Sequence, residues 1–166
     1  MPVTPVTAAV IVVSNEIAAG SDENRAGPVA VEELARHDVR AEASVVADDA
    51  AAIAGAVHAA AEAGHRVILT CGGTGIGPTD VTVDAVRPLL AAELPGVGEE
   101  IRRRGLVATP LALVSREVAG VLARDAGPSA LVVCAPGSRG GVRDAIAVVG
   151  PLIRYLLGQL DGRPRA

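Results

Sequence analysis

The segment of residues 71–80, CGGTGIGPTD, places four glycines within six residues and ends in an aspartate. It follows an apolar run, residues 67–70, that is typical of a buried strand. Glycines at the carboxyl end of a strand let the backbone approach a ligand and turn several N–H groups towards it, and such loops favour anions. The spacing matches neither a dinucleotide fingerprint nor a P-loop, which needs a lysine that the chain lacks. The segment therefore predicts an anion-binding loop, with a flexible turn between a strand and a helix as the alternative.

Acidic residues follow two of the predicted strands. Asp48 and Asp49 come after the run of residues 39–45, and Asp80 closes the glycine-rich segment. Because the carboxyl ends of parallel strands meet at one edge of an α/β sheet, these three carboxylates are expected to converge. Carboxylate and phosphate oxygens are ligands that Mg²⁺ prefers. The spacing predicts a Mg²⁺ site beside the loop, and helix capping is the alternative for each of the three aspartates.

Two further polar segments follow apolar runs. Residues 136–138, Pro-Gly-Ser, come after the run of residues 130–134 and precede a helical pattern. Ser138 is therefore expected to cap that helix, whose first amides would receive an anion. Ser115-Arg116 follows another apolar run, and Arg116 is either a bidentate phosphate ligand or a solvated surface side chain.

Charge and composition exclude several functions. The chain has 15 basic residues, all arginine, against 19 acidic ones, a net charge of -4, and no basic tail, which disfavours a nucleic-acid partner. The absence of lysine excludes Schiff-base chemistry, and a single aromatic residue, Tyr155, provides no surface for base stacking. The apolar start, residues 6–13, is too short to span a membrane. Cys71 and Cys134 are expected to be buried and unreactive, as suits a reduced cytoplasmic location.

The pattern along the chain predicts an α/β fold. Short β-branched runs alternate with Ala-rich segments of helical period from residue 8 to residue 160. Strands are predicted at residues 10–14, 39–45, 67–70, 111–114 and 130–134. Helices are predicted at residues 27–36, 49–64, 82–90, 98–104 and 142–160, the last bent or divided at Pro151. Residues 15–26 are predicted as a loop, residues 1–160 as a single domain, and residues 161–166 as a short flexible tail.

Five motifs, in order along the chain, resemble those of the molybdopterin-binding MoaB/Mog family of molybdenum cofactor biosynthesis: Gly72-Gly73-Thr74-Gly75, Asp80-Val81-Thr82, Pro95-Gly96 with Glu99, Ser115-Arg116 and Pro136-Gly137-Ser138. The resemblance runs from the first strand to the last helix. It implies a three-layer α/β/α domain with a mostly parallel central sheet, assembled as a homotrimer. It also implies an adenylyltransferase in which the terminal phosphate of molybdopterin attacks the α-phosphate of Mg-ATP and pyrophosphate is released.

The resemblance also assigns roles by position. Asp48 and Asp80 match the acidic residues of catalysis and Mg²⁺ binding. The residues matching the phosphate loop and the substrate cleft are Gly72, Gly73, Thr74, Gly75, Ser115, Pro136, Gly137 and Ser138. Asn15, Asn24 and Thr79 replace two aspartates and an arginine that are common in active members.

These replacements leave a second hypothesis open, a trimeric molybdopterin-binding or carrier protein without adenylyl transfer. A third is a related domain that processes a different phosphorylated substrate. Molybdopterin, ATP and further copies of the chain are the partners that the resemblance implies, without nucleic acid or membrane.

Overall fold

The computed structural model describes residues 5–163, which contain a six-stranded sheet in the order β2-β1-β3-β6-β5-β4. The strands are β1 (Val6–Val13), β2 (Val39–Val46), β3 (Val67–Cys71), β4 (Ala92–Glu93), β5 (Ala119–Leu122) and β6 (Ala130–Ala135). The first four strands of that order run parallel, whereas β5 lies antiparallel to both β6 and β4. The predicted α/β class with a mostly parallel sheet is confirmed.

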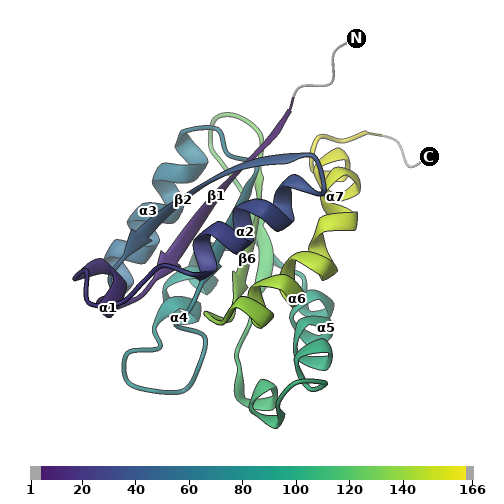
Figure 1. The fold of residues 1–166 in the computed structure, drawn as a ribbon. Coiled ribbons are helices and arrows are strands. Elements are labelled where there is room, and N and C mark those ends of the chain that lie inside the picture. The colour runs from purple at the N-terminus through teal and green to yellow at the C-terminus, as the bar shows by residue number, and fades with distance from the viewer. Residues whose placement is uncertain (1–4, 164–166) are drawn as a thin grey trace.

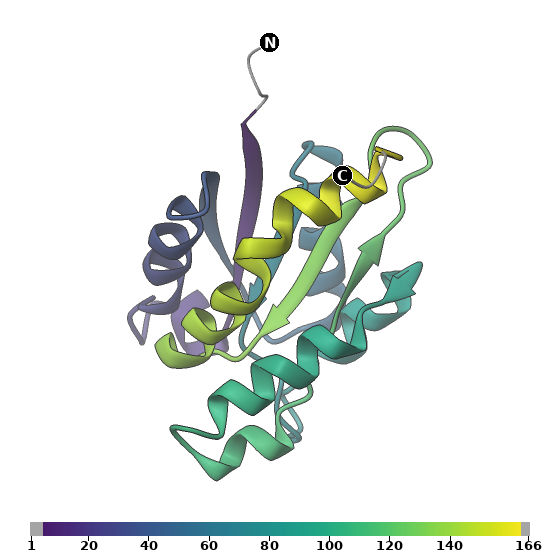
Figure 2. The same ribbon diagram turned by 90° about the vertical axis from the view of Figure 1, so that its right-hand side faces the viewer.

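Helices cover both faces of this sheet (Figure 1). The helices are α1 (Asn15–Ala18), α2 (Ala26–Ala35), α3 (Ala50–Glu62), α4 (Thr82–Val86), α5 (Pro95–Gly105), α6 (Arg139–Val149) and α7 (Ile153–Leu160). Three 3-10 helices join them: η1 (Arg87–Leu89), η2 (Pro110–Val114) and η3 (Gly150–Leu152). Helices α2, α5, α6 and α7 pack on one face and α3 and α4 on the other, which gives the three layers. Figure 2 looks onto the face that carries α6 and α7.

The alternation of side chains along the strands builds two separate cores. In β1, Val10 and Val12 contribute to the core under α2 and α6, whereas Ile11 and Val13 contribute to the core under α3 and α4. Successive side chains of a strand point to opposite faces, so a strand covered on both sides is apolar throughout. Every residue of β3 and β6 is buried accordingly.

The predicted strand at residues 111–114 is wrong, because this segment is the 3-10 helix η2. Pro110 stands in the first turn and Thr109 Oγ1 accepts the Leu111 N–H at 3.2 Å, which favours a helical turn. Leu111 and Leu113 are 71% and 67% exposed, so the apolar run has no sheet to pack against. The strand on the side of β6 away from β3 is β5, which was not predicted. The strand β4 and the short helix α1 inside the predicted loop were not predicted either.

The last helical pattern is divided as expected. Pro151 lies in η3 between α6 and α7, where its missing N–H breaks the regular helix. Of the predicted tail, Asp161 caps the end of α7 and accepts a hydrogen bond from Arg66 at 2.7 Å, and residues 164–166 lie outside the described residues. No helix within residues 5–163 is long and apolar enough to cross a membrane.

Candidate functional site

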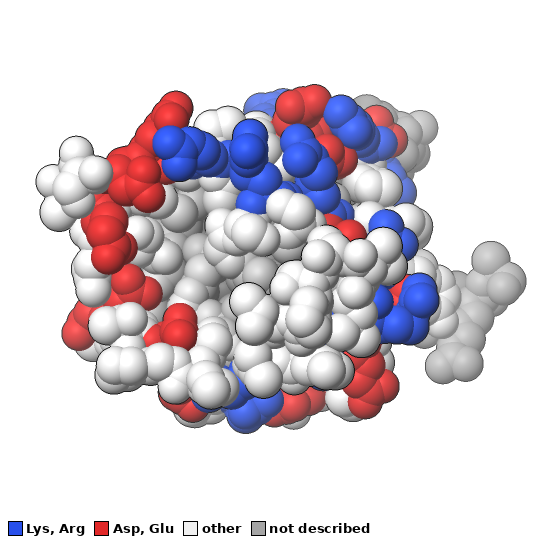
Figure 3. Space-filling model, turned by 60° about the horizontal axis from the view of Figure 1, so that its bottom comes forward, with Lys and Arg blue, Asp and Glu red and all other residues white. Residues whose placement is uncertain are grey.

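A cavity of about 480 Å³ opens where β3 and β6 end, and we call it the loop cavity. Nine of the ten site residues implied by the sequence line it: Gly72, Gly73, Thr74, Gly75, Asp80, Ser115, Pro136, Gly137 and Ser138. Strands β3 and β6 are parallel neighbours, so the loops that follow them meet at one edge of the sheet. Figure 3 looks at this end of the molecule and shows a hollowed face with acidic side chains on one side and a row of basic side chains on another. Asp48 does not line the cavity.

Glycines allow the three loop ends to approach one another. Gly72 and Gly73 have φ of +107° and +67°, in the left-handed region that disfavours other residues. A Cβ on Gly72 would lie 2.6 Å from the carbonyl oxygen of Val13, at the end of β1. A Cβ on Gly73 would collide with Thr82 Oγ1, and one on Gly137 would lie 3.1 Å from the Cα of Gly72. The glycines in this segment are therefore required by close contacts.

Unpaired backbone amides line the cavity from two sides. Within residues 5–163, the N–H groups of Gly73, Thr74 and Gly75 donate no hydrogen bond. The first N–H groups of a helix have no partner inside it, and α6 begins directly after Ser138. Ser138 caps α6 as predicted, with Oγ accepting the Gly141 N–H at 3.0 Å. Amides gathered in this way, with a helix N-terminus beside them, favour a phosphate.

The segment before β5 is attached to the glycine loop. Thr74 Oγ1 and Ser115 Oγ are 3.0 Å apart and share a hydrogen bond. The Arg116 N–H donates to the Thr74 carbonyl at 2.8 Å. Ser115 therefore reaches the cavity from the segment between η2 and β5, not from the end of the strand expected at residues 111–114.

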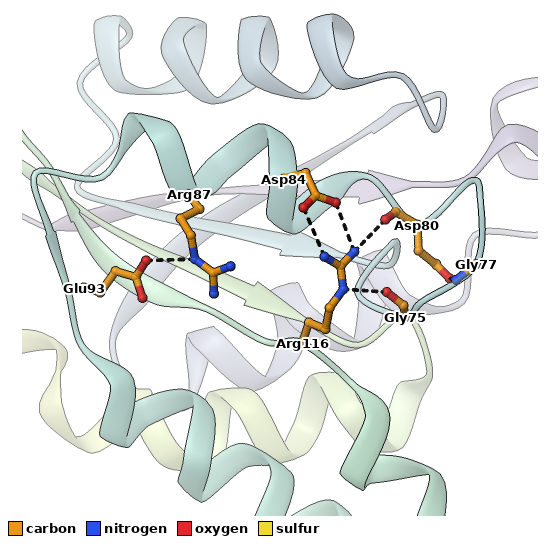
Figure 4. Close-up of polar contacts among 7 residues, drawn as sticks. All are labelled: Gly75, Gly77, Asp80, Asp84, Arg87, Glu93 and Arg116. Atoms are coloured by element: carbon orange, nitrogen blue, oxygen red, sulfur yellow. Dashed lines mark hydrogen bonds and ion pairs between the residues drawn. The ribbon is translucent and has the colours of Figure 1, made fainter.

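The Arg116 guanidinium contacts the backbone of the glycine loop (Figure 4). Its Nε donates to the Gly75 carbonyl and its Nη2 to the Asp80 carbonyl, each at 2.8 Å. Both Nη atoms also contact the Asp84 carboxylate at 3.1 Å. This pairing lowers the pKa of Asp84, chiefly through the hydrogen bonds from Arg116, and raises the pKa of Arg116. Arg116 is therefore neither the predicted bidentate phosphate ligand nor a solvated surface side chain. Its guanidinium binds the glycine loop and α4.

The three aspartates have different positions. Asp49 caps α3, with Oδ1 accepting the Ala52 N–H at 2.8 Å. Asp80 closes the loop, with Oδ2 accepting the Gly77 N–H at 2.9 Å. Asp48 pairs with Asn15: its Oδ2 accepts the Asn15 N–H and its own N–H donates to Asn15 Oδ1, both at 2.9 Å. The expected convergence of three carboxylates is wrong, since no group of three His, Cys, Asp or Glu that could hold a metal ion occurs among residues 5–163.

The outer wall of the cavity is formed by residues that the sequence did not predict. The lining residues contributed by α5, the turn after it, η2, the segment before β5 and α6 include Ile101, Gly105, Ala108, Thr109, Leu111, Ala112, Val114, Glu117 and Asp144. The Glu117 side chain is 2% exposed and pairs with Arg102 at 3.2 Å. Asp144 pairs with Arg104 at 3.5 Å. A helical hydrophobic pattern is visible in the sequence, but it does not indicate which helix covers which loop.

A second cavity, of about 460 Å³, lies on the other side of the Gly137-Ser138 turn. It is lined from the end of β1 and the loop before α2 by residues that include Ser14, Asp22, Glu23 and Arg25, and from the start of α6 by Arg139. Gly137 and Ser138 line both cavities, so the start of α6 separates them.

The two cysteines are buried on opposite faces of the sheet, Cys71 in the core under α6 and Cys134 in the core under α3. Burial raises the pKa of each thiol to about 12. The thiolate is the reactive form, so neither cysteine is suited to nucleophilic chemistry at neutral pH.

Residues 9–155 match the family model described as "Probable molybdopterin binding domain". The chain is 31% identical over 149 residues to the molybdopterin adenylyltransferase of Pyrococcus furiosus, covering 89% of this chain and 87% of that protein. It belongs to the MoaB/Mog family. The solved structure of the Mog protein of Mycobacterium ulcerans has 36% sequence identity and a TM-score of 0.84, over 93% of this chain and 99% of that one.

Some family relatives are longer. The molybdenum cofactor biosynthesis bifunctional protein of Chlorobaculum tepidum is 36% identical over 155 residues, which cover 93% of this chain and 48% of that protein. The chain thus spans about half the length of the first curated relatives it matches. The MoaB/Mog domain is the part that they share.

Proposed function

We propose that this MoaB/Mog protein binds molybdopterin in the loop cavity and transfers an adenylyl group to it from Mg-ATP. One observation carries the proposal: a cavity of about 480 Å³ is lined by the loop after β3, whose N–H groups at Gly73, Thr74 and Gly75 donate no hydrogen bond, and by the start of α6. The P. furiosus relative described as a molybdopterin adenylyltransferase supports the reaction.

The proposed reaction requires alignment more than acid–base chemistry. An oxygen of the molybdopterin phosphate forms a bond to the α-phosphorus of ATP, the bond from that phosphorus to the bridging oxygen breaks, and pyrophosphate leaves. A phosphate oxygen is already anionic at neutral pH, so no side chain has to remove a proton from it. Gly73, Thr74 and Gly75 would hold phosphate oxygens through their N–H groups, and Arg116 keeps that loop in place.

Asp80 fits a role as a Mg²⁺ ligand. Its Oδ2 accepts the Gly77 N–H, and its Oδ1 has no partner within residues 5–163. Mg²⁺ is commonly bound by one or two carboxylates together with substrate phosphates. The ion would neutralise charge on the triphosphate, and Asp80 would hold it beside the loop amides.

The test is pyrophosphate release from Mg-ATP that depends on molybdopterin. Asp80→Asn should lower this rate roughly 100-fold or more, because a metal ligand supports several kcal/mol of charge stabilisation. The asparagine oxygen can still accept the Gly77 N–H, so the fold should be kept. Asp125→Asn, an exposed position in the loop between β5 and β6, is the matched control. Unchanged turnover in Asp80→Asn would remove this carboxylate from the mechanism.

A second candidate is a molybdopterin-binding or carrier protein without adenylyl transfer. The position of Asp48 favours it, because this carboxylate lies outside the loop cavity and is bound by Asn15, which stands where active members often have an aspartate. Molybdopterin binding without any pyrophosphate release would support the carrier and exclude the transferase.

The homotrimer and the cytoplasmic location implied by the resemblance stay predictions. Analytical ultracentrifugation of the purified chain tests the first.

A further inference from the structure

Glu117 is a buried carboxylate that the proposed phosphate chemistry does not use. It lines the loop cavity and its side chain is 2% exposed. It directly follows Arg116, whose side chain is directed at α4 and the glycine loop, whereas Glu117 pairs with Arg102 of α5. Gly98 lets α5 approach closely, since a Cβ there would lie 2.6 Å from the Glu117 carbonyl oxygen.

One oxygen of this carboxylate has no partner. Arg102 Nη1 donates to Glu117 Oε2 at 3.2 Å and also to the Glu117 carbonyl at 3.2 Å. Within residues 5–163, Oε1 accepts no hydrogen bond, and Ile101 and Val114, which also line the cavity, have no side-chain donor. The residue lines the cavity, so a ligand that displaces water from this oxygen must supply a donor in its place. A carboxylate also repels phosphate, so the donor must belong to another part of the ligand.

We propose that Glu117 recognises the 2-amino-4-oxopyrimidine edge of the pterin ring and so determines which ring enters the loop cavity. The proposal rests on the proposed function, that the cavity binds molybdopterin. The pterin edge has two adjacent donors, the ring N3–H and the 2-amino group, which match the two oxygens of a carboxylate.

The adenine ring fits this carboxylate less well. Its 6-amino group is a donor, but the adjacent N1 is an acceptor and would face the second carboxylate oxygen. Each carboxylate oxygen can accept two hydrogen bonds, so Oε2 can accept from a ligand while it also accepts from Arg102. Of the two rings, only the pterin has a donor for each oxygen. The nucleotide would therefore occupy space away from Glu117.

The decisive experiment compares two rings by fluorescence titration of the intact protein. Pterin has the 2-amino donor, whereas lumazine, the 2,4-dioxo analogue, has an oxygen in its place. Wild-type protein should bind pterin at least roughly 10-fold more tightly than lumazine, because lumazine leaves a buried charged acceptor opposite another acceptor. Equal affinity for the two rings in the wild-type protein would overturn the proposal.

Glu117→Gln tests the residue itself. Arg102 should turn the amide oxygen towards itself and leave the amide NH₂ facing the ring donors. Molybdopterin should then bind roughly 10- to 100-fold more weakly, the preference for pterin over lumazine should disappear, and calorimetric affinity for Mg-ATP should stay within about 2-fold. Glu100→Gln, on the exposed face of α5 where Glu100 pairs with Arg103, is the control and should change none of these.

The outcomes separate the two proposals. Lost Mg-ATP affinity with unchanged molybdopterin affinity in Glu117→Gln would place the nucleotide at Glu117 and overturn this inference alone. Molybdopterin-dependent pyrophosphate release without ring discrimination would also leave the function standing and the inference wrong. Failure of wild-type protein to bind either molybdopterin or pterin would overturn both. If Glu117→Gln does not fold, the wild-type comparison of pterin with lumazine still decides.

Discussion

Replacing Arg116 by alanine should destabilise the protein as well as weaken the site. The guanidinium connects the glycine loop, the Asp80 carbonyl and the start of α4 through hydrogen bonds to two backbone carbonyls and an ion pair with Asp84. Figure 4 shows these contacts converging on one side chain. Alanine removes all of them and leaves the carbonyls of Gly75 and Asp80 without donors.

The two carbonyl bonds set the magnitude. A hydrogen bond that involves a charged group contributes about 1.5–3 kcal/mol, and the lower end applies because the Arg116 side chain is 33% exposed. Water can reach both carbonyls after truncation, since Gly75 and Asp80 are half-buried. The expected loss is therefore about 2–3 kcal/mol of unfolding free energy. The ion pair adds little to this, because the Asp84 side chain is 61% exposed.

Urea unfolding at a fixed protein concentration measures the loss, which should move the midpoint by about 1 M or more. Arg87→Ala is the matched control, because Arg87 is 50% exposed, forms one ion pair with Glu93 at 2.8 Å and should cost less than about 1 kcal/mol. Arg116→Lys should recover only part of the loss, since one ammonium cannot reproduce the planar fork. A value for Arg116→Ala within about 0.5 kcal/mol of the wild type, or equal to that of Arg87→Ala, would refute the reasoning.

Three other measurements follow from the structure. Gly73→Ala should cost about 1–3 kcal/mol in urea unfolding because of its positive φ and should also weaken molybdopterin binding, whereas Gly96→Ala, where a Cβ meets nothing within 4 Å, should be neutral or slightly stabilising. Cys71 and Cys134 should not react with a disulfide reagent at pH 8 until the protein is unfolded, and stability should fall between pH 9.0 and about 12 as the thiols of the unfolded chain ionise. The pKa of the Asp84 carboxyl should lie below 3.8 by NMR titration, so its ion pair stabilises the fold above that pH and is lost as the pH falls through the lowered pKa; a value of 3.8 or higher would contradict the pairing.

The sequence predicted the parallel strands better than the antiparallel ones. The strands β1, β3 and β6 are continuous apolar runs because helices cover both of their faces, and that pattern is local. In contrast, β5 is four residues long and includes Gly120, which has low strand propensity, so it gives no comparable signal. The apolar run of η2 was wrongly predicted as a strand. Its leucines are exposed beside the cavity, and composition alone cannot distinguish an exposed apolar segment from a buried strand.

The candidate site was likewise predictable only in part. Glycines, a capping serine and a proline at strand ends are recognisable locally, and they line the loop cavity. Glu117 was not predicted as a site residue, because its position depends on the ion pair with Arg102 of α5, a helix that precedes it in the chain. Asp48 has a carboxylate in the expected place in the sequence, yet Asn15 engages it outside the cavity, a pairing between residues far apart in the chain.

The absence of lysine has a specific consequence in this geometry. No arginine lines the loop cavity within residues 5–163, whereas three carboxylates do, those of Asp80, Glu117 and Asp144. The nearby arginines Arg102 and Arg104 pair with two of these carboxylates, so their charge is already matched. Under the proposed function, a phosphate in this cavity would therefore rely on backbone N–H groups and on the metal ion bound with ATP. Amide donors act only from a fixed backbone, and the close contacts of the loop glycines, the Ser138 cap and the hydrogen bonds from Arg116 fix the backbone at this edge of the sheet.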